Sequence, residues 1–392
     1  MSSAVPEGWQ ISSVEDLLTP DCLFSDGDWV ESKDQDPAGT NRLLQLADIG
    51  DGRFVNKSNR FMNDEQFTRL NCTQLQEGDV LIARMPEPIG RACILPRLDN
   101  RLATVVDIAI LRPSAVDSYW LMSVINSAGF RTKIEEQSSG TTRTRIGRTA
   151  LSKIKLLSPP LPEQKKIASI LTSVDEVIEN TQKQIDKLQD LKKATMNELL
   201  TKGIGHTEFK DSELGRIPKS WEVSLIGEVC EVGTGKKDTQ NKMKYGKYPF
   251  FVRSQTIERI DSYSFDGEAI LTAGDGVGTG KVFHYVNGRF DFHQRVYKLS
   301  DFRGGAIGKF LYYCFSSRFL KQVQQFSARG SVESVRMEMI TGMAIPLPSI
   351  QEQSKIVDCI SAIETNISID KQKLTQTQSL KKSLMQDLLT GK

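Results

Sequence analysis

The chain contains the same long helical pattern twice. The first copy spans residues 162–201 and the second residues 351–390, and a shift of 189 positions places one on the other without a gap. The agreement includes specific polar residues, since Glu163 and Gln164 fall on Glu352 and Gln353. An internal repeat of this length decides the architecture before any other feature does. We therefore expect a chain built from two related halves.

Both copies carry aliphatic side chains at alternating steps of four and three residues, the spacing of a coiled-coil seam. The aliphatic seam positions are Ile167, Leu171, Val174, Ile178, Ile185, Leu188 and Leu199 in the first copy and Ile356, Ile360, Ile363, Ile367, Leu374, Leu384 and Leu388 in the second. No proline or glycine interrupts either run, so about forty residues are predicted to rise as one helix of roughly 60 Å. So long an apolar stripe needs a partner helix, and the other copy supplies it.

Polar residues stand at two equivalent pairs of seam positions. Thr181 corresponds to Asp370, and Lys192 corresponds to Lys381. A polar group in such a seam lowers stability but favours one register of the two helices. Taken alone, the helical pattern is also compatible with a purely structural coiled-coil scaffold.

Length and composition are those of a globular protein with more than one domain. The 392 residues are 39% hydrophobic and 26% charged, and no N-terminal signal pattern is present. The most apolar run, residues 102–111, contains Asp107 and is too short to cross a bilayer. The six cysteines form no CxxC motif, which is typical of free thiols in a reducing compartment. We expect a cytoplasmic protein of prokaryotic type that makes no membrane contact.

The charge balance excludes a uniformly basic protein. The net charge is only +2, so any contact with nucleic acid has to come from local basic patches. The histidines, His206, His284 and His293, are too dispersed for a metal site.

Each helix is preceded by a globular segment that opens with the same Pro-x-x-Trp pattern. Pro6 and Trp9 begin the first segment and Pro218 and Trp221 begin the second, and we expect both tryptophans to be packing anchors. Strands are predicted at residues 79–84, 91–95 and 104–111, helices at 118–127 and 308–320, and a further strand at 151–157 that runs into a proline turn. Residues 202–220 are predicted to be a polar linker.

The combination of borders resembles the specificity subunit (HsdS) of type I DNA restriction-modification systems. Three kinds of motif carry the resemblance. The helix starts read SPPLPEQKKI at residues 158–167 and PLPSIQEQSKI at 346–356, and the helix ends read LLTKG at 199–203 and LLTGK at 388–392. Within the globular segments, the motifs are found at 78–84 with 89–92 and at 267–273 with 280–282. Their order is the same in both halves, and the resemblance covers the whole chain.

The resemblance implies an α+β fold in which two α/β target recognition domains are separated by two long antiparallel helices, with a pseudo-twofold internal repeat. The implied boundaries are 1–157 for the first recognition domain, 158–203 for the first helical region, 204–220 for the linker, 221–345 for the second recognition domain and 346–392 for the second helical region. Each domain would read one part of a split double-stranded DNA sequence, and the helices would hold the domains at a fixed distance.

The resemblance also implies partners. Two methyltransferase (modification, HsdM) subunits would bind the helices, and motor-nuclease (restriction, HsdR) subunits would complete the assembly. The subunit itself would be non-catalytic and would carry no cofactor, because S-adenosylmethionine would bind to the methyltransferase partner.

Motifs for chemistry within the chain are incomplete. Residues 273–281 (AGDGVGTGK) look like a phosphate loop, but Val282 follows Gly280-Lys281 and Asp275 stands where the first glycine is needed. The only Pro-Pro pair lies in Ser158-Pro159-Pro160-Leu161, which is not the Asn/Asp-Pro-Pro-aromatic motif of an amino-methyltransferase. A stand-alone methyltransferase or nuclease is therefore the enzyme alternative, and the scaffold without a DNA role is the other.

The candidates for DNA contact are basic and amide residues in polar loops. Arginine pairs with guanine edges or phosphates, glutamine pairs with adenine, and lysine mostly contacts phosphates. The candidates are Lys57, Arg60, Arg84, Arg91, Arg143, Arg145 and Arg148 in the first domain and Lys236, Lys237, Lys242, Lys244, Lys247, Arg253, Ser254, Gln255, Lys281, Arg295 and Arg336 in the second.

Overall fold

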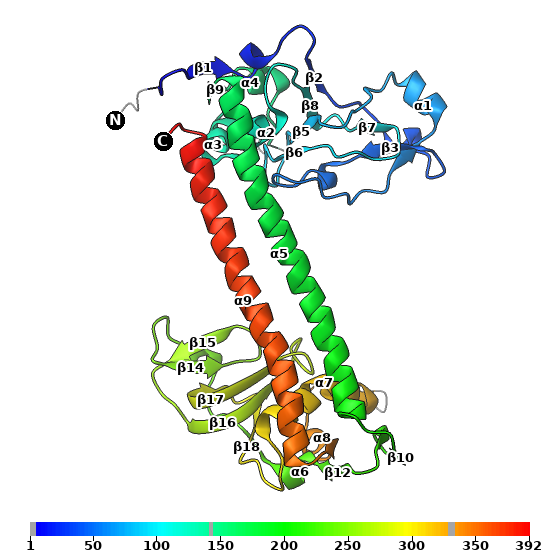
Figure 1. Cartoon of the computed structure of the whole chain (residues 1–392), viewed down its shortest axis with the longest axis vertical. Coiled ribbons are helices and arrows are strands. Elements are labelled where there is room, and N and C mark those ends of the chain that lie inside the picture. The colour runs from blue at the N-terminus through cyan, green and yellow to red at the C-terminus, as the bar shows by residue number, and fades with distance from the viewer. Residues whose placement is uncertain (1–4, 141–143, 328–333) are drawn as a thin grey trace. The chain divides into compact units, whose positions relative to one another are not determined.

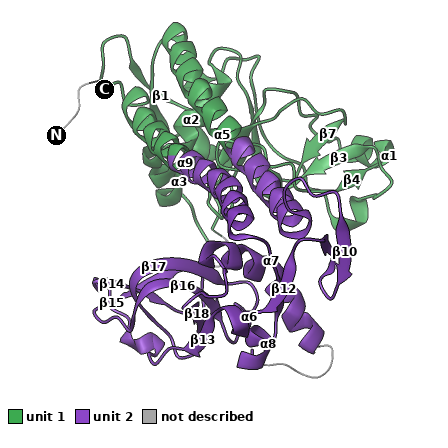
Figure 2. Cartoon of the chain, turned by 60° about the horizontal axis from the view of Figure 1, so that its bottom comes forward, with its two compact units in different colours: residues 1–181, 373–392 green, residues 182–372 purple. Residues whose placement is uncertain are grey.

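Two helices of unusual length run through both halves of the protein in the computed structural model, which describes residues 5–140, 144–327 and 334–392. Helix α5 spans Leu161–Lys202 and helix α9 spans Ile350–Leu388 (Figure 1). The chain divides into two compact units, and each unit takes one part of both helices (Figure 2). Unit 1 comprises residues 1–181 and 373–392, and unit 2 comprises residues 182–372.

The ends of α5 follow from local chemistry. Pro159 and Pro160 precede the helix, and the carbonyl of Pro160 accepts its first backbone hydrogen bond, from the N–H of Glu163. At the other end Gly203 adopts φ +67°, a left-handed conformation that favours glycine and stops a helix. A Cβ at this position would also meet Trp221 at 2.6 Å, so the turn is tightly packed.

Unit 1 contains small, mostly antiparallel sheets. Strand β1 (Gln10–Ser13) pairs with β9 (Lys155–Ser158), and a separate sheet has the order β2-β8-β5-β6. A further sheet has the order β4-β3-β7, in which β3 and β7 are parallel. The bounds are β2 Leu23–Asp26, β3 Asn41–Leu44, β4 Phe61–Met62, β5 Val80–Ala83, β6 Ala92–Ile94, β7 Leu102–Thr104, β8 Ile108–Arg112, α1 Asp64–Arg69, α2 Ser118–Asn126, α3 Ala128–Glu136 and α4 Arg148–Ser152.

Unit 2 is organised around a larger sheet with the order β13-β18-β16-β17-β14-β15, in which β14 and β17 are parallel. Strand β12 (Glu222–Leu225) pairs with β19 (Ala344–Leu347) in the way that β1 pairs with β9. The other bounds are β10 Phe209–Ser212, β11 Gly215–Pro218, β13 Glu231–Thr234, β14 Tyr248–Phe251, β15 Ile257–Ile260, β16 Phe265–Ala273, β17 Phe283–Phe292, β18 Val296–Ser300, α6 Ile226–Val229, α7 Gly308–Ser327 and α8 Met337–Thr341.

The apolar stripes of the long helices complete the cores of the two units. In unit 1, Ile167 and Leu171 of α5 are buried in a cluster that also contains Trp120 and Leu389. In unit 2, Ile356 and Ile360 of α9 are buried beside Trp221. Every seam residue proposed from the sequence is buried or half-buried, and none is exposed. The stripe therefore serves domain packing as well as helix pairing.

Three local predictions need correction. Residues 104–111 are not one strand, because a break at 105–107 separates β7 from β8. Residues 151–152 are the end of helix α4, and the strand begins only at Lys155. The region expected to be a linker contains the antiparallel hairpin β10–β11, closed at Gly215 with φ +92°.

Candidate nucleic-acid interface

Several loops of the second domain are tied together by backbone hydrogen bonds. The N–H of Gln294 donates to the carbonyl of Lys237 at 2.8 Å, and the N–H of Gly274 donates to the carbonyl of Arg295 at 2.9 Å. The loop before α8 joins them, because the N–H of Val335 donates to the carbonyl of Gly274 at 2.7 Å. The loops that follow β13, β16 and β17 and the one that precedes α8 thus form one surface, which we call the loop cluster.

An ion-pair triad joins the loop cluster to Arg253, which lies in the loop that follows β14. The carboxylate of Asp275 accepts from Arg253 at 2.7 Å through one oxygen and from Arg295 at 2.5 Å through the other. Only 10% of the Asp275 side chain is exposed, whereas 43% of Arg253 and 62% of Arg295 are exposed. Burial alone would raise the pKa of Asp275, but hydrogen bonds from both arginines and their charges outweigh it and hold the pKa below the usual value of an aspartate.

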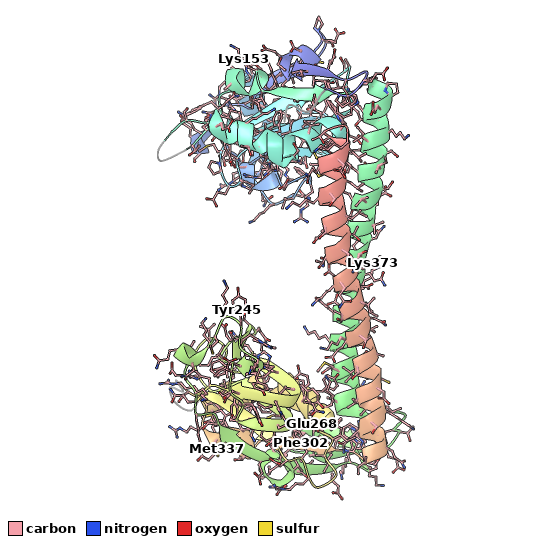
Figure 3. The ribbon with its side chains drawn as sticks, turned by 90° about the vertical axis from the view of Figure 1, so that its left-hand side faces the viewer. Lys153, Tyr245, Glu268, Phe302, Met337 and Lys373 are labelled. Carbon is pink, nitrogen blue, oxygen red and sulfur yellow. The ribbon has the colours of Figure 1, made fainter. Side chains whose placement is uncertain are left out.

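The remaining candidate residues of the second domain are found in several of its loops. Ser254 and Gln255 are exposed, and the Gln255 amide donates to the carbonyl of Lys281 at 3.3 Å. The other candidates are also exposed or half-buried: Lys236, Lys237, Lys242, Lys244, Lys247, Lys281 and Arg336. Tyr245, 85% exposed, projects from the loop before β14 (Figure 3). The residues expected to contact DNA therefore stand largely at the surface of this domain.

The first domain has a comparable junction with different side chains. The N–H of Ile146 donates to the carbonyl of Arg84 at 3.1 Å, just as Val335 donates to Gly274 in the second domain. Arg145 lies there, 3.4 Å from Asp107, with 38% of its side chain exposed. Arg148 is exposed as well. The same place in both domains thus presents basic side chains, but from different positions.

Arg84 and Arg91 are buried, contrary to the expectation that they face DNA. The guanidinium of Arg84 pairs with Asp26 at 3.0 Å, with 3% of the Arg84 side chain exposed. Burial is the main cause of the lowered pKa of each arginine. Arg91 donates to the carbonyl oxygens of Leu46 and Ile49 at 2.8 Å and 2.6 Å. Because protein acceptors occupy both groups, we assign them to the folding of the domain and not to DNA contact.

Lys57 and Arg60 are exposed, in the loop between β3 and β4. The loop is held by Asp48, which is fully buried and accepts from the backbone N–H groups of Lys57 at 2.7 Å and Ser58 at 2.8 Å. Arg143 lies outside the described residues. DNA contact by the exposed candidates stays a prediction.

Equivalent contacts attach each domain to the start of a long helix. The indole N–H of Trp9 donates to Glu163 at 3.1 Å, and that of Trp221 donates to Glu352 at 3.0 Å. The duplicated Glu-Gln pair at the helix starts was the available sequence signal for this contact.

The neighbouring glutamines are buried and join each helix start to its domain. In unit 1, the Gln164 side chain accepts from the backbone N–H of Asp117 at 3.0 Å and donates to the carbonyl of Pro159 at 2.8 Å. In unit 2, the Gln353 side chain accepts from the N–H of Ile307 at 2.8 Å and donates to the carbonyl of Pro348 at 2.8 Å. Each glutamine therefore fixes the entrance of its helix.

A second duplicated contact lies further along the helices. In unit 1, Asp175 accepts from the hydroxyl of Tyr119 and from Lys381. In unit 2, Glu364 accepts from the hydroxyl of Tyr313 at 2.7 Å and pairs with Lys192 at 2.9 Å. We call each group a tyrosine–carboxylate–lysine clamp. The clamps explain how the two seam lysines are accommodated, and they show that the helices are antiparallel within each unit.

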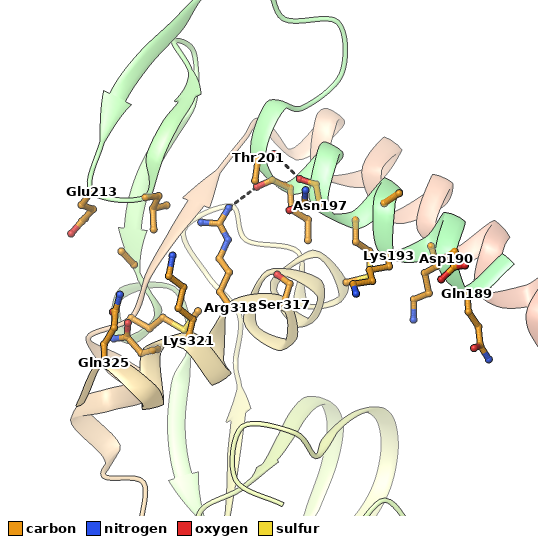
Figure 4. Close-up of a pocket in the computed structure, with 18 of the residues that line it drawn as sticks. Gln189, Asp190, Lys193, Asn197, Thr201, Glu213, Ser317, Arg318, Lys321 and Gln325 are labelled. Atoms are coloured by element: carbon orange, nitrogen blue, oxygen red, sulfur yellow. Dashed lines mark hydrogen bonds between the residues drawn. The ribbon is translucent and has the colours of Figure 1, made fainter. Parts of the chain in front are cut away.

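A wide groove of about 1260 Å³ lies in unit 2 between α5, the β10–β11 hairpin, α7 and β19 (Figure 4). Its lining includes Lys193, Arg318 and Lys321 together with the carboxylates of Asp190 and Glu213. Arg318 is held by the carbonyl of Leu200 at 2.8 Å. The groove is a surface hollow between the helix and the domain, and apolar residues such as Met196 and Leu214 line it beside the charged ones.

Two other kinds of site are absent from the described ranges. Within residues 5–140, 144–327 and 334–392 there is no grouping of three His, Cys, Asp or Glu side chains arranged to hold a metal ion. In the same part of the chain, no helix is both long enough and apolar enough to span a membrane.

Comparison with known proteins assigns both halves to one family. The family described as type I restriction modification DNA specificity domain matches residues 6–190 and again residues 218–378. The type I restriction enzyme MjaVIII specificity subunit of Methanocaldococcus jannaschii is 30% identical over 99% of this chain and 93% of its own length. The putative MjaX specificity subunit of the same organism is 25% identical over 99% of this chain and 94% of its own length.

Solved structures support the same fold. The S subunit of a type I restriction-modification system from M. genitalium superimposes with a TM-score of 0.65 at 15% identity, over 97% of this chain and 96% of that chain. A structure from work on assembly of the type I restriction-modification system superimposes with a TM-score of 0.58 at 13% identity, over 99% of each chain. With two matches of the family model, a full-length relative and the shared fold, the chain belongs to the family of type I restriction-modification specificity subunits.

Proposed function

We propose that this chain recognises a two-part double-stranded DNA sequence and directs a type I restriction-modification complex to it. The observation that carries the proposal is the duplicated attachment of two different recognition surfaces. Trp9–Glu163 and Trp221–Glu352 attach the domains in the same way. The loops that these attachments carry differ, since the second domain has the Asp275 triad where the first has Arg145 beside Asp107. Two different surfaces would read two different half-sites.

The long helices are proposed to set the distance between the two half-sites. A continuous helix of 42 residues such as α5 rises about 60 Å. Helix length would then fix the unread spacer, as dimer geometry fixes the separation of half-sites in other DNA-binding proteins.

The repeat supports two copies of one partner subunit, and membership of the specificity-subunit family suggests which partners these are. A pseudo-twofold protein offers two equivalent surfaces, so two methyltransferase subunits are proposed to bind, with motor-nuclease subunits added for restriction. The recognition chain is proposed to be non-catalytic, and S-adenosylmethionine is proposed to bind to the methyltransferase partner.

Methylome sequencing of a host that expresses the complex tests the proposal. The expected result is one bipartite methylated motif that is absent without this chain. Exchange of residues 20–155 for those of another family member should change one half of the motif only. A change in both halves would contradict independent reading domains, and methylation by the purified chain alone would favour the enzyme alternative.

Deletion of seven residues from one long helix tests the spacing role, because two helical turns are removed while the seam pattern is kept. An altered spacer or a failure to assemble is expected. An unchanged motif with full activity would contradict the role, and absence of specific DNA binding by the assembled complex would favour a scaffold without a DNA role.

A further inference from the structure

The triad of Asp275, Arg253 and Arg295 has an arrangement suited to guanine recognition. We propose that Asp275 is a positioning residue that holds two arginine forks for guanine edges in one half-site. This inference rests on the proposed function and adds to it the base that the second domain reads and the side chains that read it.

The ion pairs with Asp275 orient each arginine but leave hydrogen-bond donors available. Each guanidinium donates through one nitrogen to a different oxygen of the Asp275 carboxylate. A guanidinium has five N–H donors in a planar fork, so donors remain for a ligand. Guanine offers two acceptors, N7 and O6, in the major groove, and a bidentate arginine is the commonest specific contact to them.

The carboxylate also limits how far apart the two forks lie. Both arginines bind the same side chain, and base pairs are stacked about 3.4 Å apart. The forks are therefore placed to meet neighbouring or next-neighbouring base pairs. The backbone next to Asp275 is also fixed, because the N–H of Val335 donates to the carbonyl of Gly274, the preceding residue.

The charge of the triad fits a reading role better than a purely attractive one. One carboxylate neutralises one of the two cations, which leaves the triad with a net charge of +1. A surface evolved only to hold phosphates gains nothing from a central carboxylate, because the carboxylate weakens the attraction. A fixed orientation of the forks is the gain that offsets this loss.

The same domain contains a matched control. Arg289 on β17 pairs with Asp266 on β16 at 2.8 Å, with about half of each side chain exposed. This pair has the same chemistry as the triad, but its arginine has one carboxylate to itself and lies on paired strands outside the loop cluster. Its loss should leave the recognised sequence unchanged.

The test uses the complete complex with its methyltransferase partner and a plasmid library randomised in both half-sites. The methylated motif is read for the wild type and for R253K, R295K, D275N and R289K. Lysine keeps the charge but loses the planar fork, so a phosphate contact would tolerate it whereas a guanine contact would not. We expect R253K and R295K each to relax the requirement for guanine at one position of one half-site by about tenfold to a hundredfold.

The D275N variant should relax both positions together. Its added positive charge should at the same time preserve or strengthen binding to a scrambled duplex, with a steeper dependence on salt. A residue that only stabilised the fold would lower specific and non-specific binding alike, so a melting temperature is recorded for every variant.

Three outcomes would overturn the proposal: no guanine requirement in the half-site of the second domain, an unchanged motif in both arginine variants, or equal relaxation in R289K. The absence of any bipartite motif for the wild type would instead count against the proposed function itself.

Discussion

The ammonium group of Lys381 lies 2.6 Å from a carboxylate oxygen of Asp175. Lys192 and Glu364 form the equivalent pair, since Lys192 corresponds to Lys381 and Glu364 to Asp175 under the shift of 189 positions. Polar seam residues of a coiled coil favour one register over others, and here each lysine reaches the opposite helix to do so. Because each carboxylate also accepts from a tyrosine, the register of the helices and the seating of the domain are fixed by one group.

Removal of the Lys381–Asp175 pair should destabilise the protein measurably. About a quarter of each side chain is exposed, so water screens the pair in part. We expect a coupling energy of about 1 kcal/mol from a double-mutant cycle of K381M and D175N, measured by urea unfolding. The exposed pair Lys219–Glu208 is the control, and its coupling should be below about 0.5 kcal/mol. Equal coupling in the two cycles would contradict a structural role for the clamp.

The two tryptophan anchors should differ in their contribution to stability. Trp221 is fully buried and donates to Glu352, whereas Trp9 is only half-buried. W221F should lower the free energy of unfolding by about 2 kcal/mol, through a lost hydrogen bond and a cavity. W9F should cost about 0.5 kcal/mol, because water replaces its partner. Chemical denaturation of both variants measures the difference, and a larger loss for W9F would refute this ranking.

The stability of the clamp in unit 2 should depend on pH. Burial raises the pKa of Glu364, but hydrogen bonds from Lys192 and Tyr313, with the charges of Lys192 and Lys309, outweigh it and lower the pKa from its usual value. The folded-state pKa is then lower than the unfolded one. The stabilisation is therefore complete above the unfolded pKa of about 4.3 and is lost as pH falls through the folded value.

The variant E364Q isolates this contribution. Its stability deficit relative to the wild type should be largest at neutral pH and should shrink as pH falls below about 4. Urea unfolding at a series of pH values gives the two curves. A deficit that stays constant with pH would show that the charge of Glu364 has no part in the effect.

Cys22 should be the thiol that reacts most readily at neutral pH. Burial raises its pKa, but donors from Ser114 and Thr19 outweigh it and lower the pKa to about 7. Burial raises the pKa of Cys314 to about 12. In a C359S background, which removes the exposed thiol, iodoacetamide should label Cys22 with a rate that is half-maximal near pH 7. The S114A substitution should move that midpoint upward, and an unchanged midpoint would refute the cause.

The long helices were predictable almost to the residue. Periodicity placed the first at 162–201, and it spans Leu161–Lys202. Proline before the helix and Gly203 after it are local signals, and a continuous apolar seam is readable without tertiary information. The helix predicted at 308–320 continues to Ser327 because nothing in residues 321–327 breaks it.

The candidate site was less predictable, because burial of an arginine depends on distant residues. Asp26 and Asp107, both far away in the sequence, supply counter-charges to Arg84 and Arg145, yet only 3% of the Arg84 side chain is exposed against 38% of Arg145. Both look alike in a polar stretch of sequence. The clamps were missed for the same reason, since Asp175 and Lys381 stand 206 positions apart.

The division of the chain into units has a consequence for synthesis on the ribosome. Unit 2 is one uninterrupted stretch, residues 182–372, but unit 1 needs residues 373–392 as well. Leu389 is buried in the core of unit 1, with Leu384, Met385 and Leu388 packed against that core. During synthesis, unit 2 is therefore complete before unit 1, although unit 1 begins first. A premature stop in the final helix would leave unit 1 without the residues that complete its core.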